Sequence, residues 1–152
     1  MSTLHVLFKV GEADYVLPAS EVREMESFTG ATRIPGAASH VAGLVQIRGK
    51  VIPVIDLRVR FGLPAIERTI DSRVIVVNEG ARDVGLLADS AREVLKIEAD
   101  EFRPPPEVVT EQAAGFVSSI AQAGKRLVMR LDTERVIAVT LIPEETKNGQ
   151  DA

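Results

Sequence analysis

Residues 43–58 read GLVQIRGKVIPVIDLR, which places two apolar runs on either side of the short polar segment RGK. Each run is rich in Val and Ile, as strands are. Three residues suffice for a tight turn between the runs, because Gly49 is free to adopt a positive φ. Pro53 has no amide hydrogen to donate, so it marks an edge or a bulge in the second strand. The stretch therefore predicts a hairpin of two strands, over residues 43–48 and 51–57.

Short apolar runs of the same kind continue on both sides of this hairpin. Further strands are expected over residues 4–10, 15–17, 73–77, 84–88, 93–97, 115–122 and 125–131. Short helical turns are expected over residues 35–39, 57–61 and 132–136, the last of them capped by Asp132, and residues 19–26 fit either helical or strand spacing. The run over 73–77 is nearly all apolar, so it should be buried on both faces. The pattern predicts an all-β chain of about ten strands in two groups divided near residues 62–72, with no clear sequence repeat between them.

The composition excludes several classes of protein. The chain has 152 residues, a net charge of −4 and no cysteine. The charge argues against a nucleic-acid-binding surface, which needs clustered Lys and Arg, and the missing cysteines exclude disulfides and thiol chemistry. The N-terminus lacks the pattern of a signal peptide, and the apolar runs fall far short of the roughly 20 residues of a membrane helix. We expect a cytoplasmic protein without direct membrane insertion, formed by one domain over residues 4–142 and a polar tail over 143–152.

Residues that could carry catalysis are scarce. His5 and His40 are the only histidines and do not stand in a metal-ligand spacing, and His40 is expected at the surface. There is no Gly-x-Ser-x-Gly nucleophile motif and no phosphate-binding loop. We therefore expect no metal, no cofactor and no enzyme activity, although an enzyme built on a small β-barrel is the alternative from another class. Function should come from surfaces, as in a binding module.

The hairpin and its surroundings carry a family resemblance. Residues 41–63 are similar to the central signature of CheW-like domains, and weaker likeness extends over about residues 4–137. The resemblance implies two intertwined five-stranded SH3-like β-barrel lobes that share a hydrophobic core. It also implies a non-catalytic adaptor, recruited to membrane receptor arrays, that couples the cytoplasmic tip of methyl-accepting chemoreceptors to the regulatory domain of a CheA-type histidine kinase. Two alternatives remain: an adaptor of a pathway that controls pili, gliding or development, and an accessory protein that binds receptors without the kinase.

Two sets of contact residues follow from the resemblance. The receptor-binding set is Val22, Glu24, Gly43, Arg48, Gly85 and Val94. The kinase-binding set is Thr32, Arg33, Ile34, Val51, Ile52 and Val54, with a second, ring-closing contact at Arg103, Glu107 and Val108. Glu24 and Arg48 are expected to pair, and the apolar residues of the first set to receive a helical hairpin of the receptor. The chain departs from the family pattern at four positions: Gln46 replaces an Asn, Ser90 a Gly, Ala91 a Val, and Val108 a Phe that some members have. These departures bear on the choice of partner.

Overall fold

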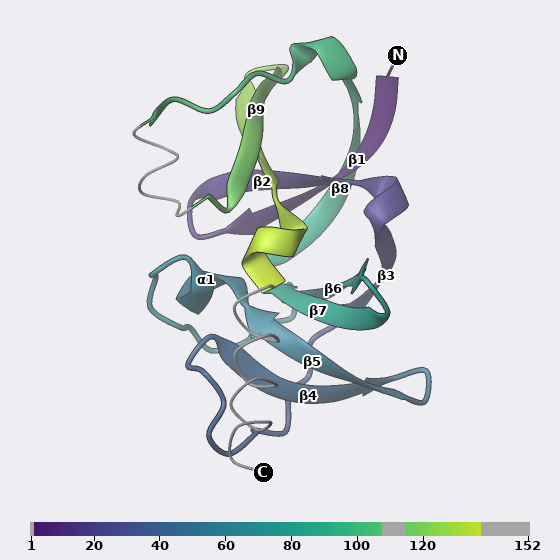
Figure 1. Cartoon of the computed structure of the whole chain (residues 1–152), viewed down its shortest axis with the longest axis vertical. Helices are drawn as coiled ribbons and strands as arrows, with labels where there is room; N and C mark the ends of the chain where they lie inside the picture. The colour runs from purple at the N-terminus through teal and green to yellow at the C-terminus, as the bar shows by residue number, and fades with distance from the viewer. Residues whose placement is uncertain (1, 108–114, 138–152) are drawn as a thin grey trace.

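The computed structural model of the chain describes residues 2–107 and 115–137, which form ten strands in two five-stranded sheets (Figure 1). The strands are β1 (Ser2–Val10), β2 (Ala13–Pro18), β3 (Val22–Ser27), β4 (Val41–Ile47), β5 (Lys50–Asp56), β6 (Arg73–Glu79), β7 (Arg82–Ala88), β8 (Ser90–Glu98), β9 (Val117–Ala123) and β10 (Arg126–Leu131). The short helical elements are η1 (Ala19–Glu21), α1 (Leu57–Arg60), η2 (Ala99–Glu101) and a turn over residues 133–137. The predicted all-β class is confirmed, and the predicted strands agree with the observed ones in place and type.

The two sheets are built to the same plan. Sheet A has the strand order β8-β1-β2-β10-β9 and sheet B has the order β3-β6-β7-β5-β4. In each sheet a central antiparallel hairpin has an antiparallel edge strand on one side and a parallel strand, with that strand's own hairpin partner, on the other. The chain thus reads as two five-strand halves that exchange their first hairpins, since β1–β2 joins the sheet of the second half and β6–β7 joins that of the first. The intertwined lobes are therefore confirmed. The predicted division near residues 62–72 does separate the two five-strand halves of the chain, but it does not separate the lobes, because that loop connects two strands of sheet B.

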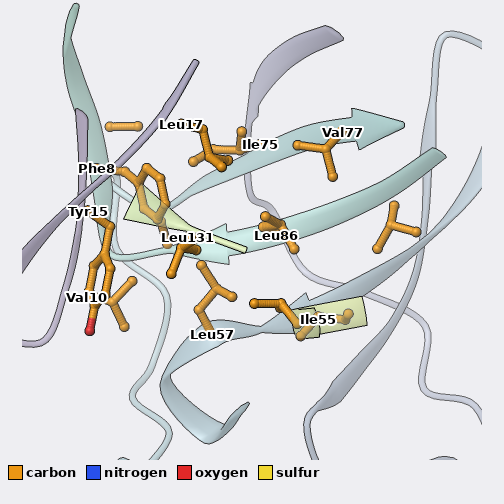
Figure 2. Packing of buried hydrophobic residues seen from close by; sticks show 14 of the residues in the cluster. Phe8, Val10, Tyr15, Leu17, Ile55, Leu57, Ile75, Val77, Leu86 and Leu131 are labelled. Atoms are coloured by element: carbon orange, nitrogen blue, oxygen red, sulfur yellow. The ribbon is translucent and has the colours of Figure 1, made fainter. Parts of the chain in front are cut away.

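Three apolar clusters explain why several strands are buried on both faces. Successive residues of a strand point to opposite faces, so β6 places Ile75 and Val77 in a cluster shared by the two sheets and Val74 and Val76 in the interior of sheet B. Sheet A has its own interior around Val16. Figure 2 shows residues of both sheets meeting in the shared cluster. Each such side chain contributes about 1.5–3 kcal/mol when fully buried, which holds the lobes together as one unit.

The predicted helical segments had mixed outcomes. The turn at 57–61 is confirmed as α1, and the Asp56 side chain caps it by accepting a hydrogen bond of 3.0 Å from the amide of Arg58. Asp132 caps the turn over 133–137 in the same way, through the amide of Arg135 at 3.1 Å. Residues 19–26 form both expected structures in succession, η1 and then most of β3. Residues 35–39 form turns instead of the predicted helical turn.

The expectation that His40 lies at the surface is wrong. Its exposed fraction is 8%, and its carbonyl oxygen accepts a hydrogen bond of 2.7 Å from the amide of Asp56. This bond extends the pairing of β4 with β5 by one step, so His40 belongs to the end of the sheet and not to a solvent-exposed turn. Burial, with the nearby charge of Arg60 adding to it, lowers the pKa of the His40 imidazole.

Candidate protein-binding site

The tip of the β4–β5 hairpin has an unusual backbone. Arg48 and Gly49 form its two-residue turn with φ angles of 51° and 81°, the signs required by a type I′ turn. Arg48 is the one non-glycine residue with positive φ in the described parts of the chain. The left-handed region costs an L-residue roughly 1–2 kcal/mol, and Asn, Asp or Gly is the usual occupant. A strained arginine at an exposed tip points to a function of its side chain.

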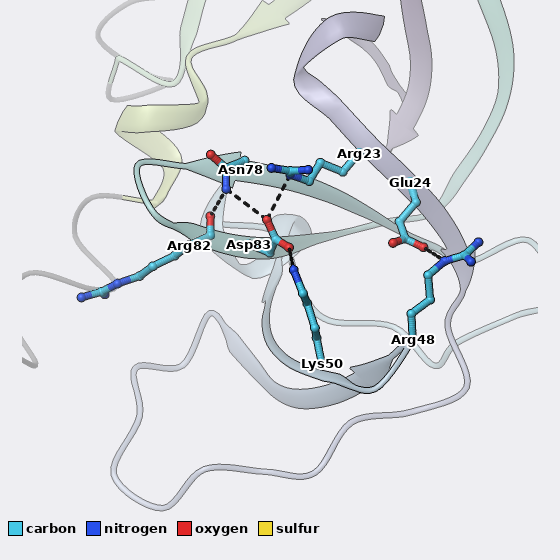
Figure 3. A network of polar contacts seen from close by, with 7 residues as sticks. All are labelled: Arg23, Glu24, Arg48, Lys50, Asn78, Arg82 and Asp83. Atoms are coloured by element: carbon cyan, nitrogen blue, oxygen red, sulfur yellow. Dashed lines mark hydrogen bonds and ion pairs between the residues drawn. The ribbon is translucent and has the colours of Figure 1, made fainter.

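The Arg48 side chain reaches across to the edge strand β3. Its Nε donates to Oε1 of Glu24 at 2.6 Å, which confirms the predicted pair. The exposed fractions of the two side chains are 75% and 25%, so the carboxylate is sheltered and the guanidinium faces solvent. The hydrogen bond to Glu24, followed by the charges of Glu24 and Glu26, raises the pKa of Arg48. The hydrogen bond to Glu24 is formed by Nε, and the two terminal nitrogens of the guanidinium point away from Glu24 (Figure 3).

A second carboxylate, that of Asp83, lies close to two cationic side chains beside this pair. Asp83, on β7, accepts a hydrogen bond of 3.1 Å from Asn78, and it lies 3.3 Å from Arg23 Nε and 3.4 Å from Lys50 Nζ (Figure 3). The hydrogen bond from Asn78 is the largest cause, and Lys50 and Arg23 are further causes, of a lowered pKa of Asp83. These four residues come from β3, β5, β6 and β7. No pattern in the sequence indicates this group, since only the order of strands in sheet B brings the four residues together.

Comparisons with known proteins place the chain in a family. The family model of the CheW-like domain matches residues 4–140. The chain belongs to the CheW-like domain family. Its relatives include Chemotaxis protein CheW of Bacillus subtilis, 30% identical over 132 residues that cover 87% of this chain and 85% of the relative. The crystal structure of scaffolding protein TtCheW from Thermoanaerobacter tengcongensis superposes with a TM-score of 0.79 at 34% identity, covering 87% of this chain and 85% of the other, and so supports the SH3-like assignment of both lobes. A more distant relative is Protein PilI of Pseudomonas aeruginosa, 28% identical over 107 residues that cover 68% of this chain and 60% of PilI.

The receptor-binding set of this CheW-like chain is only partly assembled on one surface. Val22 and Glu24 lie on β3, and Arg48, at the tip of the β4–β5 hairpin, contacts Glu24. Val94 is exposed but belongs to β8, in sheet A. Val94 thus lies in the other sheet from the Glu24–Arg48 pair, and its place in a common groove stays a prediction.

The two glycines of the set are buried. A Cβ at Gly85 would lie 2.6 Å from Val74 Cγ1, and a Cβ at Gly43, whose φ is 141°, would meet the carbonyl of Thr32. Both positions need glycine because neighbouring backbone or side chains approach too closely for any other residue. Any influence of Gly43 or Gly85 on a partner therefore acts through the packing of sheet B.

The first part of the kinase-binding set needs a correction. Val51 has an exposed fraction of 65%, but Ile52 and Val54 have fractions of 2% and 0% and lie in the interior cluster of sheet B. The alternation of β5 explains the difference, since only every second residue faces outward. The side chains of Ile52 and Val54 cannot contact a partner without unpacking the core. The outward neighbour of Val51 is Gln46, which lies directly opposite it on β4 and is also exposed.

The remaining kinase-binding residues lie on two separate connections. Thr32 and Arg33 are exposed and Ile34 is half-buried, in the segment before β4, where Thr32 exchanges two backbone hydrogen bonds with Leu44. Arg103 forms a similar bridge to Ile120 of β9. Glu107 is exposed at the end of the first described segment, and Val108 lies outside the described residues.

The described residues contain neither a cluster of three potential metal ligands nor a helix long and apolar enough to cross a membrane. The two histidines lie apart, His5 on β1 in sheet A and His40 at the start of β4 in sheet B. The His5 ring nitrogen Nδ1 lies 3.0 Å from the carbonyl oxygen of Thr3. Neither histidine is arranged with the other for acid–base chemistry.

Proposed function

We propose that this chain is a non-catalytic adaptor that couples methyl-accepting chemoreceptors to a CheA-type histidine kinase in the cytoplasm. The observation that carries the proposal is the strained Arg48 at the exposed hairpin tip, joined by Nε to the sheltered carboxylate of Glu24. Support also comes from the match to the CheW-like domain over residues 4–140 and from relatives named as chemotaxis and scaffolding proteins. On this proposal the chain joins the membrane array through its partners.

The Glu24–Arg48 pair is suited to hold a partner that presents polar groups beside an apolar ridge. Glu24 fixes the plane of the guanidinium, and the terminal nitrogens then offer a preoriented fork of donors. Apolar surface lies nearby, since Phe28 and Val45 line one hollow with Arg48. An amphipathic helix of the receptor tip would place its apolar face on such a surface and its polar flank on the fork.

The kinase contact is proposed for the outward side of β4 and β5, close to the hairpin tip. Gln46 on β4 and Val51 on β5 lie opposite each other and face outward. Thr32 lies on the same face, because it is bridged to Leu44, which is two residues before Gln46 on β4. Residues directly opposite each other in an antiparallel pair share one face of the sheet. Thr32 and Gln46 line one hollow with Arg48, so a kinase domain bound there would lie next to the Glu24–Arg48 pair.

Separate binding measurements test the two halves of the proposal. Calorimetry with a purified receptor cytoplasmic fragment, and then with the kinase regulatory domain, should give affinities near micromolar, as is common for small interfaces. Receptor binding without kinase binding would favour the accessory protein, and binding to neither would reject the adaptor function. Nucleotide turnover that follows the protein through purification would contradict the absence of catalysis.

A second candidate function is an adaptor of a chemosensory pathway that controls pili, gliding or development. The match to Protein PilI favours keeping it, because that relative is not named for chemotaxis. The fold and the contacts would be the same and only the output would differ. Deletion of the gene, followed by separate assays of swimming and of surface movement, distinguishes the two outputs.

A further inference from the structure

The tip of the β4–β5 hairpin is held by ion pairs from two strands. Arg48 reaches Glu24 on β3, while Lys50, two residues further on, reaches Asp83 on β7. Arg23, adjacent to Glu24 in sequence, also reaches Asp83. Asp83 therefore contacts Arg23 and Lys50, the cationic residues nearest in sequence to Glu24 and Arg48.

These two cations would be poorly compensated without Asp83. The side chains of Arg23 and Lys50 have exposed fractions of 58% and 71%, and both are long enough to adopt other rotamers. Glu24 is adjacent to Arg23 in sequence and pairs with Arg48, which is two residues from Lys50. A cation released by Asp83 would compete with Arg48 for Glu24, and the guanidinium would lose its fixed orientation.

The chain holds an equivalent of Asp83 in sheet A. Asp14 is the second residue of the strand that follows the tight turn of β1–β2, as Asp83 is for β6–β7. The exposed fractions of the two carboxylates are similar, 13% for Asp14 and 15% for Asp83, and Asp14 also faces a cation, Lys9, at 3.2 Å. The hairpin next to Asp14 turns through Gly124 and has no arginine corresponding to Arg48. Asp14 is thus a matched position that lacks the proposed role.

We propose that Asp83 is a positioning residue for partner binding, which engages Arg23 and Lys50 and so reserves Glu24 for Arg48. The inference rests on the proposed function and extends it to a residue that would not itself touch the receptor. Asn78 supports the role, because its amide donates both to Asp83 Oδ1 and to the carbonyl of Arg82 and so fixes the carboxylate on β7. The hydrogen bond from Asn78, followed by the hydrogen bond from Lys50 and the charges of Lys50 and Arg23, favours the charged form of Asp83 and lowers its pKa.

The test compares Asp83→Asn with Asp14→Asn in the full chain. Affinity for a purified receptor cytoplasmic fragment is measured by calorimetry, and the side-chain Nε–H resonance of Arg48 is followed by NMR. Asp83→Asn should weaken binding about three- to tenfold, the size of a coupling between neighbouring charges, and should shift the Arg48 resonance. Asp14→Asn should change neither, and Asp83→Glu should restore part of the affinity.

A second comparison separates positioning from a loss of folding. In the Arg23→Gln, Lys50→Gln background no competing cation remains, so adding Asp83→Asn should no longer weaken binding or shift the Arg48 resonance. An equal loss in that background, or wild-type affinity and an unshifted resonance for Asp83→Asn alone, would overturn the role of Asp83. If Arg48→Ala weakens binding while Asp83→Asn does not, only this inference fails. If Arg48→Ala also binds like wild type, the proposed function of the hairpin tip fails with it.

Discussion

Replacing Arg48 by alanine separates a role in binding from a role in folding. The side chain is 75% exposed and bonds to Glu24, so its removal deprives the sheltered carboxylate of Glu24 of this partner. Exposed ion pairs contribute little to stability, and we expect the melting temperature to change by less than about 5 °C. Binding should respond more strongly, because the oriented donors at the tip are lost. We expect the affinity for a receptor cytoplasmic fragment to fall between about fivefold, the effect of an above-average interface residue, and about 100-fold, that of a hot spot.

Two further variants sharpen this prediction. Arg48→Gly removes the same side chain and also relieves the left-handed strain, so it should melt at or above the temperature of Arg48→Ala while binding equally poorly. Arg126→Ala is the matched control, since Arg126 forms a bidentate pair with Glu93 at 2.8 and 2.9 Å in sheet A. The control should keep receptor affinity. Wild-type affinity for Arg48→Ala, or an equal loss for Arg126→Ala, would refute the reasoning.

Three other predictions concern the core and its protonation. Ile52→Ala should lower the free energy of unfolding by about 2–5 kcal/mol, whereas Val51→Ala should change it by less than about 0.5 kcal/mol, as denaturant titrations would show; equal costs would contradict the assignment of the two faces of β5. Gly85→Ala should cost about 1–3 kcal/mol, because the added methyl group meets Val74 at 2.6 Å, and an unchanged midpoint would show that the strands can separate. His40 has a lowered pKa in the folded state, so the unfolded state binds more protons at pH values just below the ordinary pKa of histidine. The free energy of unfolding should therefore fall as the pH decreases from 8 to 5.5. This dependence on pH should be weaker in His40→Gln, and an unchanged dependence would reject the contribution of His40.

The sequence predicted the local parts of the fold better than their assembly. Alternating and apolar runs located the strands, and Gly49 marked the turn of β4–β5, because these features depend on a few neighbouring residues. The order of strands in each sheet depends instead on pairs distant in sequence, such as β1 with β8 and β5 with β7. Exchange of the first hairpins between the two halves leaves no local signature. The expected division near residues 62–72 therefore followed the order of the chain and missed the arrangement in space.

The sequence likewise predicted only part of the candidate site. The resemblance led to Glu24 and Arg48, and the structure places them in contact. It also assigned partner contacts to Ile52 and Val54 as members of one continuous run, although the alternation of β5 turns both into the core. Asp83 and its cations had no signal in the sequence, since a carboxylate after a turn is common and its partners come from three other strands.

Reconstitution of kinase control tests the central claim most directly. Receptor cytoplasmic fragments attached to vesicles, a CheA-type kinase and this chain are combined, and autophosphorylation of the kinase is measured as the amount of the chain is increased. If the chain is the coupling adaptor, kinase activity should rise until the chain is stoichiometric with the kinase, should require the receptor fragments, and should rise much less with Arg48→Ala. Kinase activity that is the same with and without the chain, in mixtures where the receptor fragments and the kinase are both active, would contradict the account.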